Sequence, residues 1–205
     1  MALSKIQAES MNLADTYAFT GTVTGAGDTN NPTHITRVTN SSNVSSINVQ
    51  SCFSASYDVY KIVFYLGTTT GNGDVYLRFL KNTSDVFTGA NLNGSLVGAL
   101  GTTSLTDING GVASHLFLRL SNYDIWNGNT SGLGGEILIA NPYNTSEGRM
   151  HIKYQGIGDG AAQVLNYDGG WIYSGSEVAT GFQIYSGASP FNFGFAEINV
   201  YGYTQ

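Results

Sequence analysis

The sequence predicts an all-β fold, namely a jelly-roll-like antiparallel β-sandwich preceded by a short N-terminal segment. The 205 residues include 27 glycines and 12% aromatic side chains, and Ser, Thr and Asn are abundant, so turn and strand formers outnumber helix formers. Eight or more strand-like runs follow one another from His34 onward, separated by turn clusters. The length suits one sizeable core. We therefore expect a β-sandwich domain at 29–205 after a segment at 1–28.

The N-terminal segment, 1–28, combines apolar residues at helical spacing with a Thr- and Gly-rich linker. Its apolar positions recur every three or four residues as far as Leu13, which permits a short helix. Such a helix is too short to be stable alone, so its side chains should pack on another subunit or on a larger assembly. The expected oligomerisation and attachment residues are Leu3, Ile6, Met11, Leu13, Tyr17 and Phe19.

The first strands are expected at "HITRV" (34–38), "SSINVQ" (45–50) and "YDVYKIVFYL" (57–66). In the third run, alternate residues from Ile62 to Leu66 share one face, while Val63 and Tyr65 share the other. Because both faces are apolar, this strand should be central. The turn "GTTTGNGD" (67–74) leads into "VYLRFL" (75–80), and the two runs are the best candidate for a hairpin.

The stretch from 81 to 111 is weakly patterned, and no strand can be placed there. In the later run 148–156, Met150, Ile152 and Tyr154 should face inward, and in the last run Ala196, Ile198 and Val200 should alternate with polar residues. The later strands are expected at "SHLFLRL" (114–120), "GGEILIANP" (134–142), "GRMHIKYQG" (148–156), "GGWIYSGS" (169–176), "GFQIYSG" (181–187) and "FGFAEINVYGY" (193–203).

The charge and the single cysteine restrict the classes of function. Only 11% of residues are charged, the formal net charge is −6, and the eight Lys and Arg residues are scattered, which argues against nucleic-acid binding. Cys52 cannot form an intrachain disulfide and is expected to act as a small apolar residue in or beside a strand. The chain has no apolar run long enough for membrane insertion and no secretory core, so we expect synthesis in a cytoplasm.

The search for catalytic chemistry finds little. His34, His115 and His151 lie far apart in sequence, and no Ser-His-Asp arrangement or metal spacing accompanies them. A glycosidase would need two carboxylates, for which Asp159, Asp168 and Glu177, or Asp124 and Glu136, are candidates. However, Asp159-Gly160 and Asp168-Gly169 are typical turn dipeptides. "GNGD" (71–74) and "DINGG" (107–111) could hold Ca²⁺, but hairpin turns explain both. We expect no enzyme, no metal and no cofactor.

Aromatic residues in polar surroundings are the more informative feature. They occur in "SNYDIWNGNTSG" (121–132) and "NYDGGWIYSG" (166–175). Sugar rings stack on aromatic faces while amides and carboxylates bind hydroxyls, so the two stretches are candidates for glycan-binding loops. The alternative is that both tryptophans pack at strand ends or at a subunit interface. The candidate residues are Tyr123, Trp126, Asn127, Tyr167, Trp171 and Tyr173.

The opening "MALSKIQAESMNLADTYAFTGTVTGAG" resembles the N-terminal segment of fibre, whisker and other structural proteins of tailed bacteriophages, especially those of marine and cyanobacterial hosts. "YDVYKIVFYL", "VYLRFL", "GGEILIANP" and "FNFGFAEINVYGY" resemble the body of such proteins. The resemblance covers most of the chain except 81–111. It implies a virion structural protein, trimeric, whose N-terminus docks on the particle and whose β-sandwich projects outward.

Two functional hypotheses follow from these patterns. The first is a non-enzymatic virion protein, a fibre or decoration subunit in the head or the tail, with itself and other virion proteins as partners. The second is a carbohydrate-binding module that recognises a host surface glycan. The two functions can coexist in one protein, because tethering several weak sites raises their joint affinity.

Overall fold

The computed structural model describes residues 31–70, 75–81, 91–100, 103–112, 116–118, 132–144, 148–158, 163–174, 178–186 and 192–203. The compact unit that holds the described strands spans Pro32–Gln205. The predicted segment 1–28 and its six candidate attachment residues, Leu3 to Phe19, lie outside the described residues, so their roles stay predictions.

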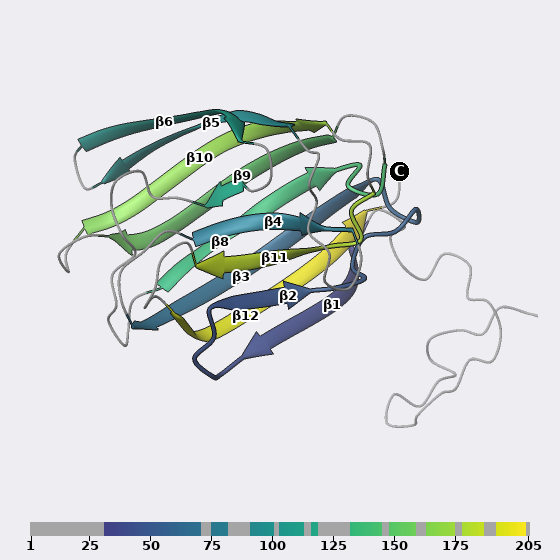
Figure 1. Cartoon of the computed structure of the whole chain (residues 1–205), viewed down its shortest axis with the longest axis horizontal. Helices are drawn as coiled ribbons and strands as arrows, with labels where there is room; N and C mark the ends of the chain where they lie inside the picture. Colours follow the sequence, from purple (N-terminus) through teal and green to yellow (C-terminus); the bar gives the residue numbers. More distant parts are fainter. Residues whose placement is uncertain are drawn as a thin grey trace, which may run out of the picture. The chain divides into compact units, whose positions relative to one another are not determined.

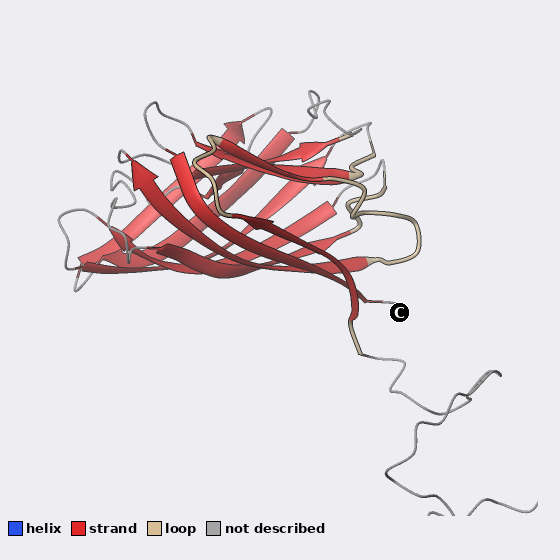
Figure 2. Ribbon diagram, turned by 90° about the horizontal axis from the view of Figure 1, so that it is seen from below, coloured by secondary structure: helices blue, strands red, loops and turns tan. Residues whose placement is uncertain are grey.

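The described residues form twelve antiparallel strands in two sheets that face each other (Figures 1 and 2). The larger sheet has the order β1 (Thr33–Asn40), β12 (Asn192–Tyr203), β3 (Val59–Thr70), β8 (Gly132–Ala140), β9 (Gly148–Gly158), β10 (Gln163–Ser174), β5 (Asn91–Leu100) and β6 (Thr103–Val112). The smaller sheet has the order β2 (Ser46–Val49), β11 (Gly181–Ser186), β4 (Val75–Leu80) and β7 (Leu116–Leu118). The all-β sandwich predicted from the sequence is confirmed.

Eight of these strands have the topology of a jelly roll. Strands β1, β12, β3 and β8 lie side by side in one sheet, and β2, β11, β4 and β7 lie side by side in the other. The chain therefore crosses repeatedly between the two layers, as in a double Greek key. The hairpin β5–β6 is inserted between β4 and β7, and the hairpin β9–β10 is inserted between β8 and β11. Both insertions extend the larger sheet beyond β8 (Figure 1).

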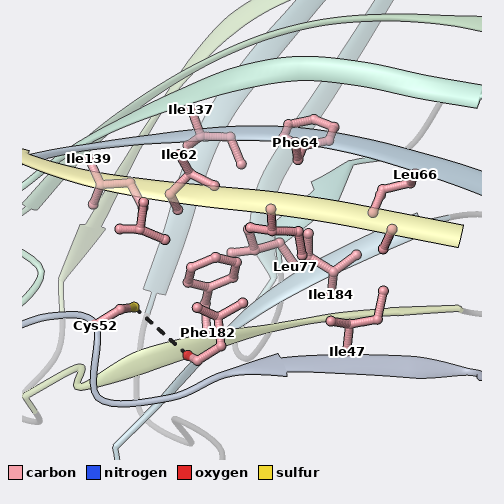
Figure 3. Close-up of a cluster of buried hydrophobic side chains, with 14 of the residues drawn as sticks. Ile47, Cys52, Ile62, Phe64, Leu66, Leu77, Ile137, Ile139, Phe182 and Ile184 are labelled. Atoms are coloured by element: carbon pink, nitrogen blue, oxygen red, sulfur yellow. Dashed lines mark hydrogen bonds between the residues drawn. The ribbon is translucent and has the colours of Figure 1, made fainter. Parts of the chain in front are cut away.

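The hydrophobic core lies between the smaller sheet and the jelly-roll half of the larger sheet (Figure 3). Side chains alternate across a strand, so each strand sends every second residue into the core. Each fully buried aliphatic or aromatic side chain contributes about 1.5–3 kcal/mol relative to exposure. The core side chains include Ile47, Val49, Phe53, Ile62, Phe64, Leu66, Val75, Leu77, Phe79, Leu133, Ile137, Ile139, Phe182, Ile184, Phe193, Ala196, Ile198 and Val200.

Strand β3 has the predicted alternation and the predicted central position. Ile62, Phe64 and Leu66 are buried, and β3 is central because it pairs with both β12 and β8. The residues between them behave differently, since Val63 is 38% exposed and Tyr65 is 48% exposed. The smaller sheet covers only one face of the larger sheet, so the second apolar face of β3 is directed to solvent.

The predicted hairpin between 57–66 and 75–80 is wrong. Strand β3 pairs with β12 and β8 in the larger sheet, whereas β4 pairs with β11 and β7 in the smaller sheet. The physical reason is the core: the apolar faces of β3 and β4 cover each other across the sandwich, while a hairpin would place both faces on one side. A two-residue turn would have enforced pairing, but the longer connection permits a crossing of about 10 Å between sheets.

The weakly patterned stretch 81–111 contains β5 and most of β6. The alternation of apolar and polar residues is interrupted there by Asn93, Gly94, Gly98 and Asn109. A strand with several glycines can be held by ladder hydrogen bonds to its neighbours without a clear sequence signal. The motif "DINGG" (107–111), interpreted as a hairpin turn, lies within β6 and is no turn.

Candidate functional site

The exposed face of the larger sheet gathers polar and aromatic side chains from β3, β8, β9 and β10. We call this side, which is turned away from the smaller sheet, the outer face. The strand register places Val63, Glu136, Lys153 and Asp168 in one row across four neighbouring strands. These positions alternate with the buried ones, so the same pleat that builds the core also builds this surface.

A hollow of about 350 Å³ lies on the outer face. It exists because Gly134 has no side chain: in its row Tyr65 lies on one side and Gln155 on the other, and the glycine leaves the space between them empty. The hollow is lined by Val63, Gly134, Gly135, Glu136, Lys153 and Gln155.

The ring of Tyr65 lies across the glycines beside this hollow. A Cβ atom at position 132 would be 2.7 Å from two ring carbons and the hydroxyl oxygen of Tyr65, and one at position 134 would be 3.4 Å from the ring. The ring also contacts Phe195, with centroids 5.7 Å apart and planes at 59°. Tyr65 is 48% exposed and Phe195 is 42% exposed. We call these two rings with Gly132 and Gly134 the tyrosine platform, an exposed pair of tilted aromatic rings in which the Tyr65 ring rests on the backbone of the two glycines.

Two charged pairs lie on the outer face near the hollow, and Lys153 lines the hollow itself. Lys61 Nζ donates to Glu136 Oε2 at 2.6 Å, and His151 Nε2 lies 2.7 Å from Asp168 Oδ1. The hydrogen bond from Lys61 lowers the pKa of Glu136, and the nearby charges of Lys61, Lys153 and His151 lower it further. The same hydrogen bond raises the pKa of Lys61. These exposed pairs add little stability, but they fix polar groups at the rim of the hollow.

This arrangement suits recognition of a hydroxyl-rich, uncharged ligand. An exposed aromatic face can stack against a sugar ring, and carboxylate, amide and ammonium groups can bind its hydroxyls. The lowered pKa of Glu136 is the opposite of what the general acid of a glycosidase requires. In the described part of the chain, no cluster of three or more His, Cys, Asp or Glu side chains could hold a metal ion.

The residues predicted to bind glycan are only partly placed. Tyr123, Trp126 and Asn127 lie outside the described residues. The second stretch, 166–175, is predicted as a glycan-binding loop and, from 169 onward, as a strand. Its residues up to Ser174 belong to strand β10, so the strand prediction is confirmed and the loop prediction is wrong. Asp168-Gly169 is likewise inside β10 and is not the turn that the dipeptide suggested.

The register shows which side of the sheet these β10 positions occupy. Trp171 pairs with Met150, which pairs with Ile139 of the core. Tyr167 and Tyr173 share this side with Trp171, because strand positions two apart lie on one face. Their positions are therefore on the side opposite to the hollow, and binding of glycan by the three residues stays a prediction.

The sequence did not single out the residues of the tyrosine platform. The signal available was the second apolar face of β3, Val63 and Tyr65, next to a strand with glycines at 132 and 134. Sequence alone could not show that β3 and β8 are neighbours, which is what brings the ring over the glycines. Of the histidines, His34 packs edge-on against Tyr201 at 5.3 Å and His151 pairs with Asp168, while His115 lies outside the described residues.

Comparison of the chain with family models, with curated proteins and with solved structures found no match. Within the described ranges, none of the secondary structure is a helix of the length and hydropathy needed to cross a membrane.

Proposed function

We propose that the protein is a non-enzymatic structural subunit of a tailed-phage virion, and that its jelly roll contacts a hydroxyl-rich carbohydrate of the host surface. The resemblance of the N-terminal segment and of four strand motifs supports the first half of the proposal. The tyrosine platform beside a polar hollow is the observation that carries the second half. An open aromatic ring flanked by paired charges suits weak, repeated contacts better than a reaction.

The position of the platform along the sheet suits a displayed module. The described chain enters the sandwich at Thr33, which pairs with Gly202 near the C-terminal end of β12. Val59 lies at that end of β3, and Tyr65 is six residues further along the strand. At about 3.3 Å per residue the ring is roughly 20 Å from the entry point. A subunit held by its N-terminus would thus direct the platform away from its attachment.

Binding of carbohydrate is tested with Tyr65→Ala. Purified full-length chain is applied to immobilised neutral polysaccharides from the host envelope, and retention is compared between variants. Loss of a stacked aromatic ring should weaken binding by about tenfold, because such contacts are worth roughly 0.5–1.5 kcal/mol beyond the buried area. Tyr143→Ala is the matched control, since Tyr143 is a tyrosine 40% exposed outside the platform. Equal retention of wild type and Tyr65→Ala would contradict the proposal.

Incorporation into a virion is tested separately by removing residues 1–28. Under the virion hypothesis the shortened chain is missing from assembled particles but keeps its carbohydrate affinity. If it still enters particles at the wild-type level, the docking role of the segment is wrong. The alternative function is a free-standing carbohydrate-binding module. That function is favoured if the full-length chain and the shortened chain both bind carbohydrate but neither is found in assembled particles. Digestion of the polysaccharide by the purified chain would instead indicate an enzyme.

A further inference from the structure

The solvent side of the smaller sheet holds an arginine in a fixed position. Core residues of β2, β11 and β4 point inward, so Asn48, Gln183 and Arg78, which pair across these strands, lie on the opposite side. Arg78 Nε donates to Gln183 Oε1 at 2.6 Å, and Gln183 Nε2 donates to Asn48 Oδ1 at 2.6 Å. Gln183 is only 8% exposed. The buried side-chain amide of Gln183 therefore fixes the position of the Arg78 guanidinium through its Nε–H group.

Two tyrosines complete this surface. Arg78 Cζ lies 4.5 Å from the centroid of the Tyr185 ring, and Tyr185 stacks on Tyr76 with centroids 5.3 Å apart and planes at 26°. A guanidinium that lies over an aromatic face keeps its in-plane N–H donors for a further partner. We call Arg78, Tyr185 and Tyr76 the arginine–tyrosine face.

Among the described residues, no carboxylate pairs with Arg78. The four strands of the smaller sheet contain one charged residue, Arg78, and no Asp or Glu. The ion pairs of the described residues are Arg37–Glu197, Lys61–Glu136 and His151–Asp168, and all lie on the larger sheet. Hydrogen bonds of Arg78 within the described residues use Nε alone.

We propose that the arginine–tyrosine face binds the carboxylate of an acidic sugar, a hexuronic acid unit of a polysaccharide. The two terminal nitrogens of Arg78 match a carboxylate bidentately, while the tyrosine rings offer an apolar surface to the pyranose ring. A single guanidinium balances the charge of one planar carboxylate. This site goes beyond the proposed function: it lies on the other sheet and selects a charged ligand, so either site can fail alone.

The test titrates the full chain with tetragalacturonate. Binding is followed by calorimetry and by the NMR signal of the Arg78 side chain. The fully methyl-esterified tetramer keeps the sugar rings but removes the charge, and it should bind at least about tenfold more weakly, as expected when a charged hydrogen-bonded pair is lost. A pentaglutamate peptide supplies carboxylates without sugar rings and should also bind at least about tenfold more weakly.

Variants locate the contact. Arg78→Gln should weaken tetragalacturonate binding by about tenfold or more, and Arg78→Lys should weaken it less, because lysine keeps the charge but loses the planar fork. Arg37→Gln on the larger sheet is the matched control and should bind like wild type. Thermal unfolding checks that each variant is folded, and the ester comparison on wild-type protein decides the question if Arg78→Gln does not fold. Three results would each overturn the proposal: equal affinity for tetragalacturonate and its methyl ester, higher affinity for pentaglutamate than for tetragalacturonate, or a folded Arg78→Gln protein that binds tetragalacturonate like wild type.

Discussion

At the scale of single residues, two glycines of β8 have different functions although they are only two positions apart. A Cβ atom at Gly132 would collide with the Tyr65 ring at 2.7 Å, whereas one at Gly134 would make ordinary contact at 3.4 Å. Gly132 therefore makes room for the ring, and Gly134 forms the floor of the hollow. The two substitutions to alanine should consequently separate stability from binding.

We predict that Gly134→Ala keeps the fold and places a methyl group in the hollow. Replacing a strand glycine whose conformation suits alanine stabilises by about 0.4–1 kcal/mol through the unfolded state, while the methyl group reduces carbohydrate retention. Gly132→Ala should displace the Tyr65 ring and lower both the stability of the protein and its retention on carbohydrate. Urea unfolding and the polysaccharide retention assay measure the two effects. Unchanged retention in a more stable Gly134→Ala protein would show that the hollow does not take part in binding.

The Lys61–Glu136 pair gives a prediction for pH. The pKa of Glu136 is lowered in the folded protein, chiefly by the hydrogen bond from Lys61. The contribution of Glu136 to the stability of the fold is therefore fully present above the ordinary carboxyl pKa of about 4.3. That contribution is lost as the pH falls through the folded value. Lys61→Gln should move the pKa of Glu136 upward, and Lys153→Gln, which removes only a nearby charge, should move it less. Carboxyl ¹³C NMR titration measures both, and equal shifts would contradict the assigned cause.

At the scale of strands, alternation in the sequence predicts faces well and partners poorly. Alternate residues are buried in both strands, as a period of two requires: Ile62, Phe64 and Leu66 in β3, and Ala196, Ile198 and Val200 in β12. Pairing depends on sequence-distant strands: β3 lies between β12 and β8, and no local feature shows this. The hairpin prediction failed for that reason. The platform could not be foreseen either, because it joins Tyr65, Phe195 and Gly132 from three strands.

The start of β11 depends on a glycine that sequence patterns do not distinguish from others. A Cβ atom at Gly181 would be 2.3 Å from the carbonyl oxygen of Val49, a backbone atom that cannot turn away. We predict that Gly181→Ala destabilises the protein by about 1–3 kcal/mol, the usual cost of overpacking, because β11 must move away from β2. Thermal and urea unfolding measure the change. Gly134→Ala is the matched control, and a Gly181→Ala protein as stable as wild type would refute the close approach.

At the scale of the whole molecule, the jelly roll and its insertions are separable in principle. The insertion β5–β6 leaves the chain after β4 and returns at β7, and these two strands are hydrogen-bonded neighbours, with Leu77 opposite Leu116. The ends of the insertion therefore meet at one point of the smaller sheet.

We predict that replacing residues 82–114 with Asn-Gly leaves a folded sandwich. With Leu77 opposite Leu116, residues 79–81 and the Asn-Gly then form a five-residue connection, a length that suits a hairpin between β4 and β7. Strand β10 would become the edge of the larger sheet, so the shortened protein should aggregate more readily while unfolding cooperatively. Circular dichroism, thermal unfolding and light scattering measure these properties. The control replaces β2, a jelly-roll strand that supplies Ile47 and Val49 to the core, and should abolish cooperative unfolding. Loss of the fold in the first variant would show that β5–β6 belongs to the same cooperative unit as the jelly roll.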